Sequence, residues 1–208
     1  MTTRRSTHWL RAGMVALTFV AMLALARPAR AHPHVWIDAV VEAWFVKGAV
    51  TEFRVTWTFD DFFSAMAIDD FDENRNRTLE DAELQKLASV SEETLAASGY
   101  FMHVIIDAAA LVVEAVRDFT AAVTDKGLLR YTFTVVLPDP VDPSRRALSV
   151  ALYDDNYYVD VALNKMDPVR LKGEMPLACT FAVAEDRDHS FYLGMIYPMR
   201  VRIQCIRA

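Results

Sequence analysis

From residue 35 onward the chain alternates between apolar and polar positions. Apolar side chains occupy the odd positions from Val35 to Phe45, and a second alternating run extends from Thr51 to Phe59. A period of two is typical of a strand with one buried face. Because Lys47-Gly48 separates the runs and supplies a turn, the pattern predicts a long β-hairpin.

The period of the pattern changes between Asp60 and Tyr100. Apolar side chains such as Phe63, Met66 and Leu84 recur there at helical spacings, and β-branched residues become rare. This part of the chain is therefore predicted to form two helices separated by a polar loop.

Strand patterns resume after residue 100, at 101–106, 129–137, 148–153 and 157–163. Three prolines between 138 and 143 predict a loop. The sequence favours an α+β fold: one mostly antiparallel, sandwich-like β domain over residues 32–208, with a helix-loop-helix of EF-hand type inserted at about 60–99.

Residues 1–31 have the three parts of a cleavable signal peptide. Arg4, Arg5 and Arg11 are followed by an apolar run at 12–26 and by small residues at Ala29 and Ala31. The run is shorter than the roughly 20 residues that cross a bilayer. We therefore expect export to the periplasm, a mature protein that begins at His32, and no membrane insertion after cleavage.

The charge of the chain becomes strongly negative once the signal peptide is removed. Residues 1–31 hold five of the 22 basic side chains and none of the 28 acidic ones, so the remainder has a net charge of −11. Such a field repels phosphate backbones and attracts cations. Nucleic-acid binding is therefore not expected.

The chain holds two cysteines, Cys179 and Cys205. Each falls on the apolar face of an alternating segment, and an oxidising compartment permits disulfides. We predict a disulfide between them, in preference to two buried thiols or a thiolate metal pair, because no CxxC spacing is present.

The polar loop between the predicted helices matches the twelve positions of an EF-hand calcium loop. Oxygen atoms at positions 1, 3, 5, 7, 9 and 12 bind calcium in such loops. The corresponding residues are Asp72, Asn74, Asn76, Thr78, Glu80 and Glu83.

Two features qualify this interpretation. Arg77 stands at the sixth position, where a left-handed turn normally takes glycine. With only three carboxylates we expect weak calcium binding, with a dissociation constant of about 10⁻⁴ to 10⁻³ M.

Two alternatives to this loop assignment exist. A twelve-residue frame that starts at Asp70 fits the calcium-loop pattern less well. The alternative to a calcium site is a polar turn in which Thr78 and Asp81 form a capping box.

The predicted new amino terminus brings two histidines together. The α-amine and imidazole of His32, with His34, supply nitrogen ligands that suit zinc, nickel or copper. Asp38 lies on the same alternating face, and Asp60 approaches from the paired strand. The alternative is that His32 to His34 form a solvated leader; for His103 and His189 a structural or surface role is expected.

Three segments resemble a family of uncharacterised bacterial periplasmic proteins that are often labelled substrate-binding components of ABC-type transport systems. They are HPHVWID from His32, WTFDDFFS from Trp57 and YDDNYYVD from Tyr153. The resemblance implies an accessory role beside an inner-membrane transporter of nickel, cobalt or zinc. It carries over no catalytic residues.

The leading hypothesis is a non-enzymatic periplasmic metal-handling protein with a structural calcium loop. One alternative is a copper oxidase or oxygenase that uses an amino-terminal histidine chelate with an open coordination position. Another is an interaction module of a transporter that binds no transition metal.

Overall fold

The computed structural model describes residues 33–175 and 178–206. The predicted signal peptide and His32 therefore lie outside the described residues. Within them the protein is a mixed α+β structure dominated by β-sheet, as the sequence pattern predicts. None of the helices in the described ranges is long and apolar enough to cross a membrane.

The chain begins with the predicted hairpin, formed by β1 (Val35–Val46) and β2 (Ala49–Phe59). Their antiparallel register runs from Ile37 opposite Phe59 to Val46 opposite Ala49. Lys47 and Gly48 both have positive φ, of 50° and 82°, as the two central residues of a primed hairpin turn require. A two-residue turn and a one-sided apolar pattern together set this register.

Two helices follow the hairpin. They are α2 (Asp61–Phe71) and α3 (Asp81–Ala96), and a short 3₁₀ turn η1 (Gly99–Phe101) leads from α3 back into β-structure. Asp60 begins α2 as its N-cap, because its carboxylate accepts a hydrogen bond from the Phe63 amide at 2.9 Å.

The strands of the described residues form two sheets. The larger one, which we call sheet A, has the order β5-β6-β2-β1-β8, with β9 also beside β1; the smaller one, sheet B, has the order β10-β11-β7-β3-β4. The remaining strands are β3 (Met102–Ile106), β4 (Ala109–Leu111), β5 (Arg117–Val123), β6 (Leu129–Val141), β7 (Leu148–Leu152), β8 (Val159–Leu163), β9 (Val169–Gly173), β10 (Ala178–Glu185) and β11 (Met199–Ile206).

Two details of sheet A differ from the sequence-based expectation. β8 and β9 pair with β1 in parallel, whereas the other pairs of the described strands are antiparallel. The predicted proline loop is wrong in part, since β6 continues through Pro138 and Pro140 to Val141. The ladder with β2 shifts register between Val136 and Val141, and β5 does not pair with that stretch of β6, so the missing amide protons are tolerated.

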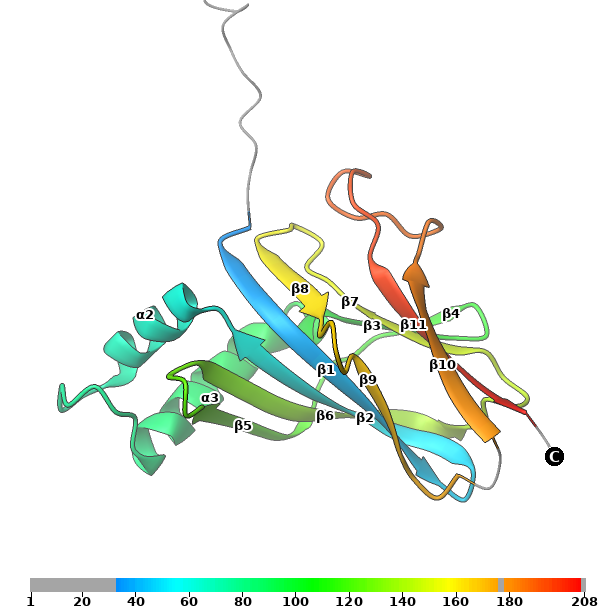
Figure 1. Ribbon diagram of the computed structural model, residues 1–208, viewed down its shortest axis with the longest axis horizontal. Coiled ribbons are helices and arrows are strands. Elements are labelled where there is room, and N and C mark those ends of the chain that lie inside the picture. The colour runs from blue at the N-terminus through cyan, green and yellow to red at the C-terminus, as the bar shows by residue number, and fades with distance from the viewer. Residues whose placement is uncertain (1–32, 176–177, 207–208) are drawn as a thin grey trace, which may run out of the picture. The chain divides into compact units, whose positions relative to one another are not determined.

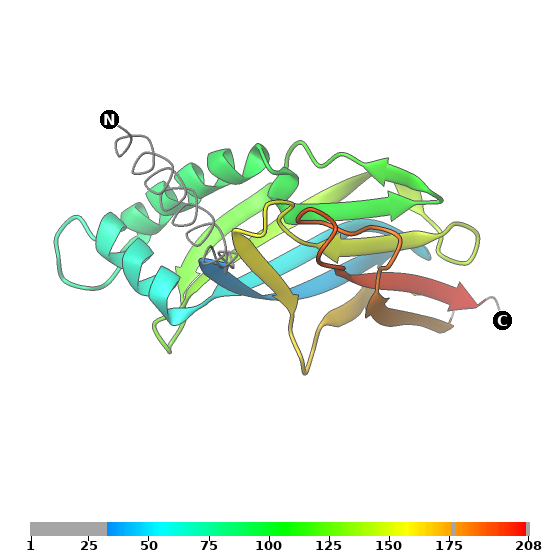
Figure 2. The ribbon, with the colours of Figure 1, turned by 90° about the horizontal axis from the view of Figure 1, so that it is seen from above.

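The inner face of sheet A is covered by two different layers. Sheet B packs over one end of the long strands, and helices α2 and α3 lie at the other end (Figures 1 and 2). Trp57 lies at the junction, where its ring stacks on Phe101 at 5.8 Å and meets Phe133 edge-on at 4.9 Å. One continuous apolar core therefore underlies both layers.

Candidate functional site

The loop between α2 and α3 is organised around the carboxylate of Asp72. This side chain is 9% exposed, and its two oxygens accept hydrogen bonds from the backbone amides of Asn76 at 3.1 Å and Arg77 at 2.5 Å. Arg77 adopts the left-handed conformation, with φ 66°. The chain thus bends tightly around the residue at the first position of the predicted calcium loop.

Glu83, at the twelfth position, closes the same loop from the side of α3. Its carboxylate is buried and accepts from the backbone amides of Glu73 at 2.8 Å and Glu80 at 2.9 Å. Glu80 is the N-cap of α3, and Glu80 and Glu83 form its capping box. The alternative box between Thr78 and Asp81 is therefore wrong, because α3 begins two residues later than that frame needs.

Two asparagine side chains between Asp72 and Glu83 make the remaining hydrogen bonds of the loop. Asn74 and Asn76 each accept a backbone amide through Oδ1, and both donate through Nδ2 to the Glu80 carboxylate, at 3.2 and 2.6 Å. The pKa of Glu80 is lowered, first by its interaction with the Glu83 side chain and then by the Asn76 amide. Leu79, at the eighth position, is buried in the core.

The second predicted site lies where β1 begins. His34 is exposed, with its ring 4.9 Å from that of Tyr158. Asp38 shares its face of β1 and accepts a hydrogen bond from Asn164 at 2.9 Å. Asp60 uses one oxygen to cap α2 and the other to accept from the Trp36 amide at 2.8 Å. Both Asp60 oxygens are therefore engaged within the fold.

The described part of the chain contains no group of three or more His, Cys, Asp and Glu side chains that is arranged to hold a metal ion. His32 lies outside that part, so the predicted amino-terminal chelate is untested. The calcium loop also remains a prediction, although its first and twelfth residues lie at the two ends of one compact turn.

The two remaining histidines each contact one partner of the buried ion pair between Arg200 and Asp186. His103 donates from Nε2 to the Tyr153 carbonyl at 3.0 Å and stacks on the Tyr153 ring at 3.6 Å. Arg200 donates to the His103 carbonyl at 3.0 Å and forms a buried ion pair with Asp186. His189 is 2.9 Å from the same carboxylate. Burial acts to raise the pKa of Asp186, but Arg200 and His189 outweigh it, so that pKa is lowered.

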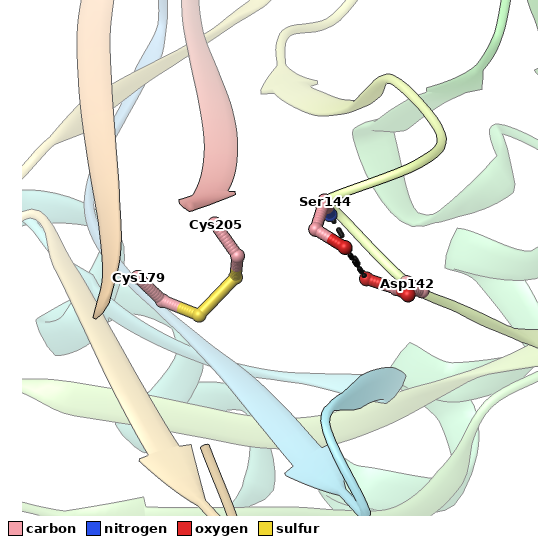
Figure 3. The surroundings of a disulfide bond; sticks show 4 residues. All are labelled: Asp142, Ser144, Cys179 and Cys205. Atoms are coloured by element: carbon pink, nitrogen blue, oxygen red, sulfur yellow. Dashed lines mark hydrogen bonds between the residues drawn. A yellow bond between two sulfur atoms is a disulfide. The ribbon is translucent and has the colours of Figure 1, made fainter. Parts of the chain in front are cut away.

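The predicted disulfide is confirmed. Cys179 of β10 and Cys205 of β11 are directly opposite in the antiparallel ladder, with a Cα separation of 4.1 Å (Figure 3). The loop after β6 faces this bond, and there Ser144 donates from N and Oγ to the Asp142 carboxylate. The bridge therefore joins the edge strand of sheet B to its neighbour.

An apolar cavity of about 310 Å³ lies beneath the two helices. We call it the α2–α3 groove. It is lined by Val35, Ile37, Trp57, Phe59, Phe63, Met66, Ala67, Asp70, Phe71, Leu87, Val90, Ser91, Thr94, Leu95, Phe101, Tyr131, Tyr158 and Val159. Sequence reasoning identified the apolar faces of the helices but missed the groove, because the sheet residues of its floor are distant in the chain.

Comparison with known proteins places the chain among proteins without an assigned function. It is 31% identical over 129 residues to an uncharacterized 15.5 kDa protein from the trpE 3' region of Spirochaeta aurantia, a match that covers 62% of this chain and 91% of that protein. An uncharacterized protein of Haemophilus influenzae is 28% identical over 130 residues, which are 62% of this chain and 61% of that protein. Residues 17–192 match the model of a family described as protein of unknown function, DUF1007. The chain therefore belongs to the DUF1007 family.

Proposed function

We propose that the protein is an exported, non-enzymatic metal-handling protein and that its loop from Asp72 to Glu83 binds calcium. The observation that carries the calcium proposal is the pair of buried carboxylates, Asp72 and Glu83, at the first and twelfth positions of a turn between two helices. A buried carboxylate needs compensation by hydrogen bonds or a cation. Calcium takes six to eight oxygen ligands and accepts flexible geometry. The acidic loop offers oxygen atoms at the positions that calcium-binding loops use, and a bound cation would add to the hydrogen bonds that already compensate Asp72 and Glu83.

The test is a calcium titration of the mature protein by calorimetry and thermal unfolding. We expect binding at about 10⁻⁴ to 10⁻³ M, because two arginines flank the carboxylates. Glu83→Gln keeps an acceptor oxygen for the cap of α3 but removes the bidentate acid, and it should abolish the calcium-induced rise in Tm. The matched control is Glu93→Gln, on an exposed position of the same helix, which should respond as the unaltered protein does. Absence of heat and of any shift at millimolar calcium contradicts the proposal.

We further propose a role in handling nickel, cobalt or zinc, as an accessory to an inner-membrane metal transporter. Its support is the resemblance to transport-system components, together with the exposed positions of His34, directly before β1, and of Asp38 on β1. Imidazole and amine nitrogens suit these metals and copper. The disulfide agrees with an oxidising, extracytoplasmic location.

This second role is tested by comparing two amino termini. Protein that begins at His32 should bind zinc or nickel with a Kd of about 1 µM or lower. Protein with one additional residue before His32 should bind more weakly, because its α-amine is displaced from the imidazoles. Equal affinity of the two forms contradicts the terminal-amine chelate, and the absence of binding in both contradicts the transition-metal role itself.

A further inference from the structure

The α2–α3 groove is walled by helices and floored by a sheet face. Met66 and Val90 stand at its rim, 46% and 49% exposed, while Trp57 and Phe59 on the floor are buried. Phe62, one turn before Met66 on α2, is 72% exposed. Apolar surface therefore continues from the cavity to the outside of the helix pair, and such surface is typical of an interaction site.

The polar groups of the groove leave its interior suited to an apolar insert. The hydroxyls of Ser91 and Tyr131 are 2.7 Å apart and satisfy each other. Burial raises the pKa of Tyr131, which keeps the phenol neutral. The indole Nε1 of Trp57 lacks a hydrogen-bond partner in the described residues, but this atom is itself buried. The part of an occupant that enters the groove is thus apolar.

The surroundings of the groove are acidic. The segment from Asp60 to Gly99 carries eleven acidic and three basic side chains, a net charge of −8. Asp70 lines the groove, and the one lysine of the segment, Lys86, is paired with Glu73 at 2.5 Å. This field attracts a cationic partner and repels the anionic head group of a fatty acid or phospholipid.

The walls of the groove also limit which secondary structure a bound segment can have. An extended peptide adds to a sheet through free backbone groups at its edge, whereas the sides of this groove are helices whose backbone groups are bonded internally. The floor is the face of sheet A, formed by strands β1, β2 and β6 that pair on both sides. Side chains from one face of a helix fit such a groove without backbone pairing.

We propose that the α2–α3 groove binds an amphipathic helix of a partner protein, with apolar anchors at i, i+3 or i+4 and i+7 and with lysine or arginine on its flanks. The apolar anchors enter beside Met66 and Val90, and the basic flanks face Asp70 and the acidic helix surfaces. This role is independent of metal binding by the loop.

The test uses a synthetic helical peptide of leucine and lysine with one apolar face, titrated by calorimetry into the mature protein in buffer with EDTA. Two peptides serve as controls: one of the same composition, scrambled to remove the apolar face, and one with glutamate in place of lysine. We expect only the first to bind. Val90→Gln and Met66→Gln should each weaken its binding about five- to tenfold, since they remove apolar contact at the rim.

Matched variants distinguish binding of the peptide in the groove from nonspecific binding elsewhere on the surface. Val112→Gln makes the same change at a residue that is 76% exposed and does not line the groove, and it should leave the affinity unchanged. Asp70→Asn should weaken binding, and Asp139→Asn, at an exposed position on β6, should weaken it less. Circular dichroism establishes that each variant is folded.

Three results overturn the proposal. One is equal binding of the amphipathic and scrambled peptides, which indicates attraction by charge alone. Another is equal loss of affinity in Val90→Gln and Val112→Gln. The third is saturable binding of laurate, sensitive to Val90→Gln, with no binding of the peptide, which assigns the groove to an acyl chain instead.

Discussion

Among single residues, His103 shows most clearly how burial sets charge. Its ring stacks on the Tyr153 ring, and its Nε2 donates to a backbone carbonyl. Burial is the largest influence on the pKa of His103 and lowers it from the usual 6.5. The folded protein therefore holds this histidine neutral at pH values where the unfolded chain begins to take up a proton.

The free energy of unfolding should consequently fall as the pH is lowered through the unfolded pKa of about 6.5 toward the lower folded pKa. His103→Gln removes this pH dependence and the part-buried hydrogen bond to the Tyr153 carbonyl. We expect the variant to have a free energy of unfolding about 1 kcal/mol lower than that of the unaltered protein near neutral pH. This difference should shrink on acidification, because only the unaltered protein loses stability as His103 takes up a proton. Urea unfolding at several pH values measures this. His34→Gln, at an exposed histidine, is the control, and a difference for His103→Gln that is constant with pH contradicts the assignment.

At the scale of elements, the loop between α2 and α3 holds a conformation that its sequence does not favour. Arg75 and Arg77 have φ of 62° and 66°, and a side chain in the left-handed region costs roughly 1 to 2 kcal/mol. The buried Asp72 carboxylate imposes this geometry on Arg77 by accepting its amide. Local strain is thus offset by the hydrogen bonds that fold the loop.

Replacement of Arg77 by glycine should relieve this strain. We expect Arg77→Gly to be more stable than Arg77→Ala by about 1 kcal/mol, because both remove the guanidinium but only glycine removes Cβ. Thermal unfolding in EDTA compares the two without metal. The glycine variant should also bind calcium more tightly than the alanine variant. Equal stability of the two variants indicates that position 77 is not held in the left-handed region.

The pairing of β10 with β11 depends on the disulfide as well as on the ladder. The bridge closes a loop with a sequence separation of 26 residues, and loop-closure entropy assigns about 3 to 4 kcal/mol to it. The double variant Cys179→Ser with Cys205→Ser should lose about that much free energy of unfolding. Its amide exchange should accelerate in β10 first, since β10 is an edge strand, and remain slow in β1. Unchanged stability contradicts this expectation.

For the whole molecule, the decisive feature is that β1, β2 and β6 serve two layers. Phe53 and Val55 belong to the same core as sheet B, while Phe59 stacks on Phe63 of α2 at 4.7 Å. Neither sheet B nor the helix pair can unfold separately without exposing buried side chains of the shared strands.

Unfolding should therefore be a single transition. Far-UV circular dichroism, which follows the helices and sheets, and tryptophan fluorescence, which includes Trp57 at the junction, should give the same midpoint in urea. Two separate midpoints indicate that the helix pair melts independently, and they contradict a shared core.

Local patterns were sufficient to predict the hairpin, the helix pair and the disulfide. A two-residue turn limits the ways in which β1 and β2 can pair, and alternation places Cys179 and Cys205 on inward faces. The alternating pattern does not reveal the short strands β4, β5 and β9, and the prolines predict a loop where β6 continues. In these segments the partner strand, rather than local preference, decides the conformation.

Features that depend on neighbouring residues follow directly from the amino-acid sequence: the one-sided strands, the acidic turn between two helices, and the negative charge of the chain beyond residue 31. Which distant segments meet depends on the folding of the whole chain. It paired β8 and β9 in parallel with β1, directed both Asp60 oxygens to backbone amides, and placed the helices over aromatic side chains of sheet A to form the groove. Such contacts arise because distant apolar surfaces are buried together, and a local pattern does not specify its partner.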